Sequence, residues 1–231
     1  MESSSLPNNS TLCVIAIDGP AGAGKSTVAK RLSQVLGYAY LDTGAMYRAL
    51  TLKALRLKAD LSDERALVQI AKETHLDLIQ TPRGVQVLLD GEDVSEAIRT
   101  LDVTNNTFYI ARASGVRAIM VEWQRAMGKK RSVVVEGRDV TTVVFPNATY
   151  KFYMDADINE RSLRRLKELA EKGSSIEIDK LKKEIEERDS KDKTRTVGAL
   201  KIADDAIVID STHLSVEQTA EEILKHINKH G

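Results

Sequence analysis

Residues 19–26 read Gly-Pro-Ala-Gly-Ala-Gly-Lys-Ser and satisfy the pattern GxxxxGK[ST]. A continuous apolar run, residues 12–17, precedes them, and apolar residues at helical spacing follow over residues 26–36. Between a strand and a helix, glycines let backbone N–H groups converge on an anion at the helix N-terminus. The stretch therefore predicts a phosphate-binding loop made of Gly19, Pro20, Ala21, Gly22, Ala23, Gly24, Lys25, Ser26 and Thr27.

Two side chains of this loop have predicted roles of their own. In this motif the lysine, here Lys25, reaches the β and γ phosphates of a nucleoside triphosphate. The hydroxyl that follows it, here Ser26, binds a Mg²⁺ ion carried by the same phosphates. The sequence thus predicts that the chain binds a nucleotide together with Mg²⁺.

Outward from the loop, short apolar runs alternate with helical patterns. Strands that alternate with helices in this way pair in parallel, because each helix returns the chain to the same edge of the sheet. The alternation predicts an α/β fold, a P-loop NTPase core with a five-stranded parallel sheet flanked by helices. The predicted strands are residues 12–17, 38–41, 132–135, 150–154 and 206–209, and the predicted helices include residues 26–36, 46–57, 112–127 and 215–229.

Two segments interrupt this alternation. After a helical pattern at 62–72, strand patterns at 75–79 and 85–89 enclose the turn Thr81-Pro82-Arg83-Gly84, and strands so close must pair antiparallel. Charged helical patterns at 159–172 and 179–188 are joined by Gly173-Ser174-Ser175, which we expect to be flexible. The predicted division is a disordered tail (1–11), a core (12–59, 106–156 and 196–231), a small inserted subdomain (60–105) and a charged helical segment (157–195).

Composition narrows the class of protein. The 231 residues are 42% hydrophobic and carry 34 basic against 34 acidic side chains, so no overall field attracts nucleic acid or a membrane. No apolar run reaches the roughly 20 residues of a membrane span, and residues 1–11 lack the order of a signal peptide. Cys13 is the only cysteine, which excludes an internal disulfide. We expect a cytoplasmic monomer that binds neither nucleic acid nor membrane.

A second anion site is indicated by arginines at strand ends. Arg48 follows the predicted strand at 38–41, and Arg138 follows the one at 132–135, each beside a glycine turn. Open α/β sheets bind ligands at the carboxyl ends of their strands, and guanidinium groups suit a phosphate monoester. The DxxG and [NT]KxD motifs of GTPases are absent from the sequence. A small-molecule kinase is therefore favoured, although surface ion pairs are the alternative reading for these arginines.

With these motifs in place, the chain resembles the bacterial cytidylate kinases, the CMP and dCMP kinases among the nucleoside monophosphate kinases. The resemblance extends over residues 14–225. It implies ATP and CMP or dCMP as substrates, with in-line transfer under a closing lid. It also implies that the core is a kinase core, that residues 60–105 form a monophosphate-binding subdomain and that residues 157–195 form the lid. The motifs that carry it are IDGPAGAGKST (17–27), LDTGAMYR (41–48), GEDVSEAIRT (91–100), EGRDVTTVVFPNA (136–148), ERDSKDKTR (187–195) and DDAIVIDST (204–212).

The resemblance also implies roles for individual residues. Arg48 and Arg138 are expected to bind the acceptor phosphate with Tyr47 and Thr43, while Arg117 and Asp139 read the cytosine edge. Arg188 and Asp192 are expected to hold the sugar, Arg195 to bridge the two phosphates, and Arg161 and Arg165 to cover the ATP phosphates. The residues expected to be catalytic are Lys25, Arg138, Arg188 and Arg195.

The match is incomplete at a few positions. Thr141 stands where the family usually has glycine, Phe108 where a small hydroxyl residue is expected, and Lys191 and Lys193 where arginines are common. Other acceptors, such as UMP, AMP or shikimate, therefore stay open as an alternative. A nucleotide-binding module without catalytic activity is another. The four histidines lie outside all of the motifs, so none is expected to act as a base.

Overall fold

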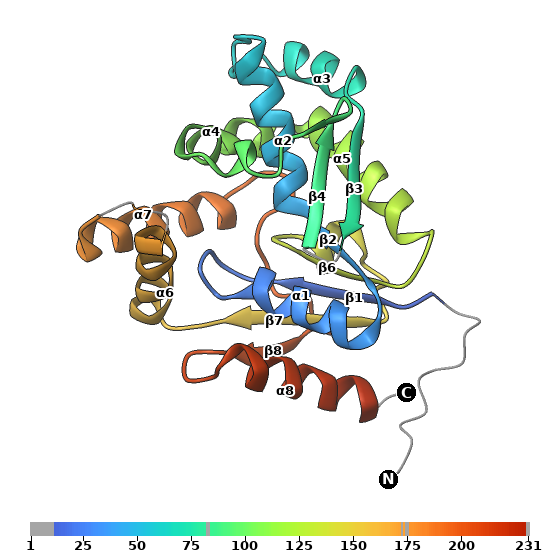
Figure 1. Cartoon of the computed structure of the whole chain (residues 1–231), viewed down its shortest axis with the longest axis vertical. Helices are drawn as coiled ribbons and strands as arrows, with labels where there is room; N and C mark the ends of the chain where they lie inside the picture. The colour runs from blue at the N-terminus through green and yellow to red at the C-terminus, as the bar shows by residue number, and fades with distance from the viewer. Residues whose placement is uncertain (1–11, 82–83, 172, 174–175, 230–231) are drawn as a thin grey trace.

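A computed structural model describes residues 12–81, 84–171, 173 and 176–229 (Figure 1). The tail predicted to be disordered, the Pro82-Arg83 centre of the predicted turn and Ser174-Ser175 of the predicted joint lie outside the described residues. At the centre is one sheet of five parallel strands in the order β2-β6-β1-β7-β8, which confirms the predicted fold class. These strands are β1 (Val14–Asp18), β2 (Ala39–Asp42), β6 (Val133–Gly137), β7 (Tyr150–Asp155) and β8 (Ile207–Asp210).

Alternating side chains of the central strands bury both faces of the sheet. On β1, Ile15 and Ile17 pack under two helices that cover one face, and Ala16 packs under two helices that cover the other. The first pair of helices is the N-terminal α1 and the C-terminal α8, and the second pair is α2 and α5 (Figure 1). Their bounds are α1 (Lys25–Leu36), α2 (Thr43–Arg56), α5 (Ser114–Gly128) and α8 (Val216–Lys229).

The segment between α2 and α5 adds a small second sheet. Strands β3 and β4 pair antiparallel, as the close spacing of the two patterns predicts, and a short β5 extends the pair. Leu67, Val87 and Ile110 of this segment belong to the same hydrophobic cluster as Met46 and Met120. The segment therefore packs directly on the core. Its elements are α3 (Glu64–Lys72), β3 (Leu76–Thr81), β4 (Gly84–Leu89), β5 (Glu92–Asp93), the 3₁₀ turn η1 (Ala97–Arg99) and α4 (Leu101–Arg112).

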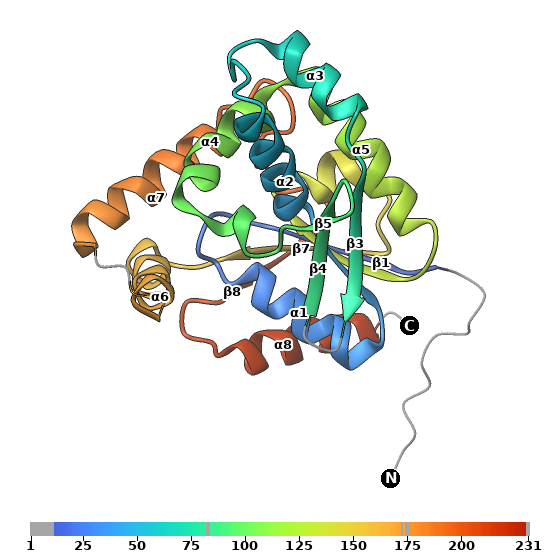
Figure 2. The same ribbon diagram turned by 45° about the horizontal axis from the view of Figure 1, so that its top comes forward.

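Two charged helices lie on the opposite side of the molecule from the β3–β4 hairpin (Figure 1, Figure 2). They are α6 (Ile158–Glu171) and α7 (Ile178–Lys193), and α7 extends five residues beyond the predicted end of its helical pattern. Leu181 and Ile185 form a small apolar cluster between them. None of the helices in the described ranges is long and apolar enough to cross a membrane.

Buried carboxylates shape the loops at the carboxyl ends of the strands. Asp42 accepts a hydrogen bond from the Ala45 amide (2.7 Å), so α2 begins at Thr43, three residues before the predicted start. The Asp18 carboxylate accepts hydrogen bonds from the amides of Val140 (2.9 Å) and Thr141 (2.7 Å) and from the Thr141 hydroxyl (2.6 Å). These bonds hold a turn of π-helix, η2 (Val140–Val144), that no pattern predicted.

Candidate functional site

The phosphate-binding loop joins β1 to α1 and consists of backbone that only glycine adopts easily. Gly19 has φ +152°, and a Cβ there would lie 2.0 Å from the carbonyl oxygen of Met154. Gly24 precedes α1 in the left-handed region (φ +86°), and no side chain caps the helix at that residue. The first amides of α1 are therefore available to an anion, as the motif predicts.

Lys25 points into the concave side of this loop. Its side chain is buried, and Nζ donates a hydrogen bond to the carbonyl of Pro20 (2.7 Å). Burial and repulsion from Arg138 lower the pKa of Lys25 to about 7, although the carboxylates of Glu136 and Asp18 act in the opposite direction. A polyanion in the loop would therefore restore the charge of this ammonium group.

An oxygen-rich cluster adjoins the lysine. The Ser26 hydroxyl donates a hydrogen bond to Oε1 of Glu136 (2.8 Å), and the Tyr40 hydroxyl donates a longer one to the same oxygen (3.4 Å). The pKa of Glu136 is raised mainly by its burial and, to a smaller extent, by the nearby Asp42 carboxylate. The Thr43 hydroxyl donates to the carbonyl of Glu136 (2.8 Å) and so ties α2 to β6. Sequence reasoning missed Glu136 as a site residue, although it heads the EGRD motif.

Arginines from three parts of the chain gather beside this cluster. Arg48 pairs with Asp42 (3.1 Å), and Arg138 pairs through Nε with Asp192 (2.7 Å), which also binds Arg195. Burial alone would raise the pKa of Asp192, but the surrounding arginines outweigh it and lower the pKa. Asp192 thus holds Arg138 and Arg195 together, while Arg48 is held by a separate carboxylate, Asp42.

This arginine cluster has unused binding capacity. The Nε atoms of Arg48 and Arg195 are buried and have no hydrogen-bond partner within the described part of the chain. Arg188 has neither an ion pair nor a hydrogen bond there, and the displacement of water together with repulsion from Arg138 lowers its pKa to about 10. Positive charge in excess of carboxylate and unpaired N–H donors are what a phosphate ester requires.

The predicted base-reading pair is also assembled. Arg117 and Asp139 form a buried ion pair, and the Arg117 guanidinium lies over the ring of Tyr47, 5.6 Å from its centroid. Burial raises the pKa of Asp139 to about 6, although Arg117 lowers it. Gly198, which sequence reasoning missed, packs against the pair in the left-handed region (φ +66°). A Cβ at residue 198 would lie 2.0 Å from Nη2 of Arg117.

The two lid arginines differ in their surroundings. Arg161 is buried, forms an ion pair with Asp189 and donates a hydrogen bond to the carbonyl of Ala21 in the loop (2.9 Å). Arg165 pairs with Glu168 (2.8 Å) and is partly exposed. The structure therefore places Arg161 against the phosphate-binding loop itself and leaves Arg165 at the helix surface.

A cavity of about 420 Å³ adjoins the arginine cluster at Arg195, away from the phosphate-binding loop. Phe108 lines it, with the guanidinium of Arg112 5.4 Å and the ammonium of Lys191 5.7 Å from the ring centroid. Phe108 therefore contacts cations from both α4 and α7 where a small hydroxyl residue was expected.

The sequence of this chain matches a known family over nearly its full length. A family model described as cytidylate kinase matches residues 15–229. A cytidylate kinase of Desulforamulus reducens is 48% identical over 93% of this chain and 96% of its own, and one of Anoxybacillus flavithermus is 48% identical over 91% and 93%. An uncharacterized protein of Eubacterium ventriosum with a solved structure shares the fold, with a TM-score of 0.52 at 13% identity over 95% of this chain and 99% of its own.

Gly198→Ala should lower stability more than a matched glycine substitution. Gly37 has nearly the same dihedral (φ +67°), but no atom lies within 4 Å of a Cβ at residue 37, so Gly37→Ala tests backbone strain alone. We expect Gly198→Ala to reduce the free energy of unfolding by about 1–3 kcal/mol more than Gly37→Ala, because it also displaces the Arg117–Asp139 pair. Urea denaturation measures both, and equal losses would refute close packing of Gly198 on the pair.

Proposed function

The chain belongs to the cytidylate kinase family, and on that premise we propose that it performs the family reaction, ATP-dependent phosphorylation of CMP, at the loop and arginine cluster described above. The observation that carries this assignment is the presence of two adjacent anion sites. Lys25 serves one and Arg138 the other, and Arg138 is close enough to lower the pKa of Lys25. We propose dCMP as a second acceptor.

ATP is proposed to bind through residues 19–27, with backbone amides on its phosphates and Lys25 between the β and γ groups. The lowered pKa of Lys25 and the uncapped start of α1 support this assignment. Thr27 lies in the first turn of the same helix. Arg161 and Arg165 of α6 complete the proposed donor site from the lid side.

Mg²⁺ is the ion that this reaction uses, and the residues beside Lys25 fit it. Mg²⁺ prefers oxygen ligands and is bound by few protein groups when phosphates supply the others. The Ser26 hydroxyl already donates its hydrogen bond to Glu136, so a lone pair on its oxygen can face the ion. When bound, Mg²⁺ neutralises charge on the β and γ oxygens.

CMP is proposed to bind in the arginine cluster. Arg48, through its unpaired Nε, would hold the monophosphate together with Arg138, Tyr47 and Thr43. Asp139, kept in place by Arg117, offers a carboxylate oxygen to the exocyclic amine of cytosine, which uracil lacks. Arg188 and Asp192 are proposed to bind the sugar hydroxyls.

The chemistry requires little beyond alignment and charge neutralisation. An oxygen of the CMP phosphate forms the new bond to the γ-phosphorus as the bond from that phosphorus to the β–γ bridging oxygen breaks. The attacking oxygen is already ionised near neutral pH, so no general base is needed. Lys25, Arg138, Arg188 and Arg195 would stabilise the charge that spreads over the equatorial oxygens during transfer.

Water must be kept from the γ phosphate, or ATP would be hydrolysed. We assign this task to residues 157–195, which would act as a lid over both substrates. Residues 60–105 are proposed to form the monophosphate-binding side. Helix α4 begins in this segment and continues to Phe108, which lines the same cavity as Arg195. A monomer in the cytoplasm remains our prediction for the working form.

An acceptor panel tests the proposed function directly. We expect ADP to form rapidly from Mg-ATP with CMP and dCMP, and much more slowly with UMP, AMP or shikimate. Lys25→Ala should lower turnover by at least about a hundredfold, because contacts to the transferring group dominate such reactions. ADP formation that is equal for all acceptors would disprove cytosine recognition, and none at all would indicate a non-catalytic nucleotide-binding module.

Arg138→Ala should raise the Michaelis constant for CMP by at least about tenfold while that for ATP changes by less than about threefold, because Arg138 lies on the acceptor side. Steady-state kinetics with each substrate varied in turn measures both constants. Lys151→Ala is a matched control, because Lys151 pairs with Asp205 (2.7 Å) at the amino end of β7, whereas both anion sites lie at the carboxyl ends of the strands. Equal effects of Arg138→Ala on the two substrates would remove Arg138 from the acceptor site.

ATP binding should take up a proton near pH 8. The pKa of Lys25 is about 7, and the negative charge of a bound triphosphate should raise this pKa. Below pH 7 Lys25 is already protonated, so ATP binds tightly; above pH 7 binding must take up a proton, so the affinity for ATP falls as the pH rises. Calorimetry in buffers of different ionisation enthalpy measures the uptake. Lys25→Arg, whose guanidinium stays charged throughout this range, should abolish it. Uptake that persists in Lys25→Arg would assign the proton to another group.

A further inference from the structure

The phosphate-binding loop and the lid share a packed contact at Ala21. Its methyl group belongs to the apolar cluster of Leu181 and Ile185, between α6 and α7. The next residue, Gly22, lies so close to α6 that a Cβ there would be 3.0 Å from the carbonyl oxygen of Arg161. One residue of the loop is thus part of the hydrophobic interior of the lid.

Both backbone groups of Ala21 are bound by lid side chains. The Ala21 amide donates to Oδ1 of Asp189 on α7 (3.0 Å), and the Ala21 carbonyl accepts from Nη1 of Arg161 on α6 (2.9 Å). Arg161 and Asp189 form an ion pair with each other, and Nε of Arg161 donates to the carbonyl of Ala156 (3.0 Å). The pair is buried, with side chains 10% and 8% exposed, so removing one partner would leave an uncompensated charge.

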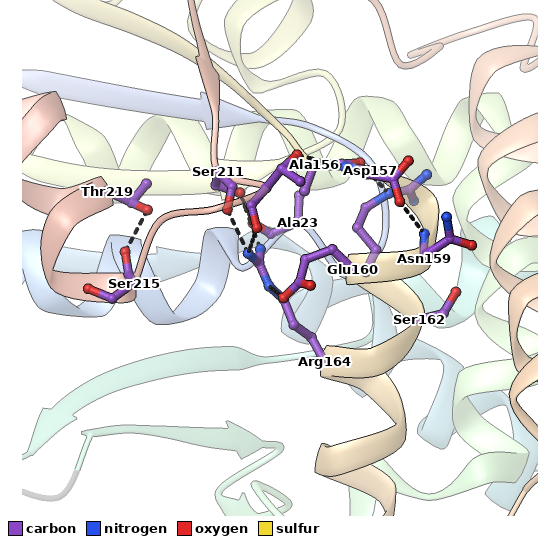
Figure 3. Close-up of polar contacts among 12 residues, drawn as sticks. Ala23, Ala156, Asp157, Asn159, Glu160, Ser162, Arg164, Ser211, Ser215 and Thr219 are labelled. Carbon is purple, nitrogen blue, oxygen red and sulfur yellow. Dashed lines mark hydrogen bonds and ion pairs between the residues drawn. The ribbon is translucent and has the colours of Figure 1, made fainter.

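A further contact joins the lid to the loop two residues beyond Ala21. Arg164 on α6 donates to the carbonyl of Ser211 (2.6 Å) and to its hydroxyl (3.2 Å), and that hydroxyl lies 3.2 Å from the carbonyl oxygen of Ala23 (Figure 3). α6 therefore reaches both Ala21 and Ala23, which enclose Gly22. The loop and α6 are held at two points, one direct and one through Ser211.

We propose that Asp189 and Arg161 act together as positioning residues, which hold Ala21 in the conformation that binds the triphosphate and so couple the lid to the loop. The proposal rests on the proposed binding of ATP in this loop. A carboxylate beside a triphosphate is electrostatically unfavourable, so its presence here requires a compensating contact. Asp189 accepts a hydrogen bond from the Ala21 amide, and its ion pair with Arg161 fixes the guanidinium that donates to the Ala21 carbonyl.

The sign of the effect on ATP affinity separates this role from its alternative. If Asp189 merely repels the triphosphate and sequesters Arg161, Asp189→Asn should tighten ATP binding. If it positions the loop, Asp189→Asn should weaken ATP binding although it removes a negative charge. We expect the dissociation constant for ATP to rise at least about fivefold and that for CMP to change less than twofold.

Equilibrium calorimetry with ATP alone, and with CMP alone, measures both constants for the full chain. Lys182→Met is the matched control, because it removes a contact between α7 and Asn159 of α6 (2.8 Å) without touching the loop, and it should leave both constants within twofold. Tighter or unchanged ATP binding by Asp189→Asn overturns the proposal. Failure of the wild-type protein to bind ATP would instead refute the proposed function.

A double mutant tests whether the two residues act as one unit. Arg161→Gln should weaken ATP binding as Asp189→Asn does. The dissociation constant of the double variant for ATP should be no higher than that of the single variant that binds ATP more weakly. Additive losses would mean that Arg161 contacts ATP independently, and they would overturn the shared role. If Asp189→Asn also loses CMP binding because it misfolds, Arg161→Lys provides the test instead. This variant keeps the positive charge but has one nitrogen, so it cannot donate from two guanidinium nitrogens as Arg161 does. Wild-type ATP affinity of Arg161→Lys would refute the proposal.

Discussion

The burial of one ammonium group governs the arrangement around it. Lys25 is buried at the start of α1, and this costs free energy that Asp18 and Glu136 recover only in part, since the pKa of Lys25 stays near 7. The nearby Arg138 increases this cost, because its positive charge repels the ammonium group. An anion with several charges, such as a triphosphate, would remove this imbalance.

Parallel strands explain how the balancing groups come together. Strand β1 ends at Asp18, β2 at Asp42, and β6 carries Glu136 one residue before its end, so three carboxylates meet at the same edge of the sheet. Each has a separate task. Asp18 holds the amides of η2, Asp42 caps α2 and pairs with Arg48, and Glu136 accepts a hydrogen bond from Ser26. These carboxylates act as fixed acceptors, while Nε of Arg48 and Nε of Arg195 keep their N–H groups without a partner in the described part of the chain.

The parts of the fold that sequence predicted are those with local causes. The loop, the five strands and most helices follow from glycine spacing, apolar periodicity and turn residues within short windows. Helix α4 was missed because threonines and asparagine dominate its middle, and the Thr104 and Thr107 hydroxyls donate to carbonyls one turn back (2.9 and 2.7 Å). Asp189 and Gly198 were missed for another reason: their partners Ala21 and Arg117 are distant in the sequence, so only tertiary packing reveals them.

Two residues that differ from the sequence-based expectation make contact with each other in the fold. Phe108 on α4 stands where a small hydroxyl residue was expected, and Lys191 on α7 stands where an arginine was expected. The lysine ammonium lies 5.7 Å from the centroid of the Phe108 ring. The two residues thus form a cation–aromatic contact between α4 and α7, typically worth about 0.5–1 kcal/mol at an exposed position. A compact ammonium on a flexible stem needs only the face of the ring, so this contact does not require a planar guanidinium.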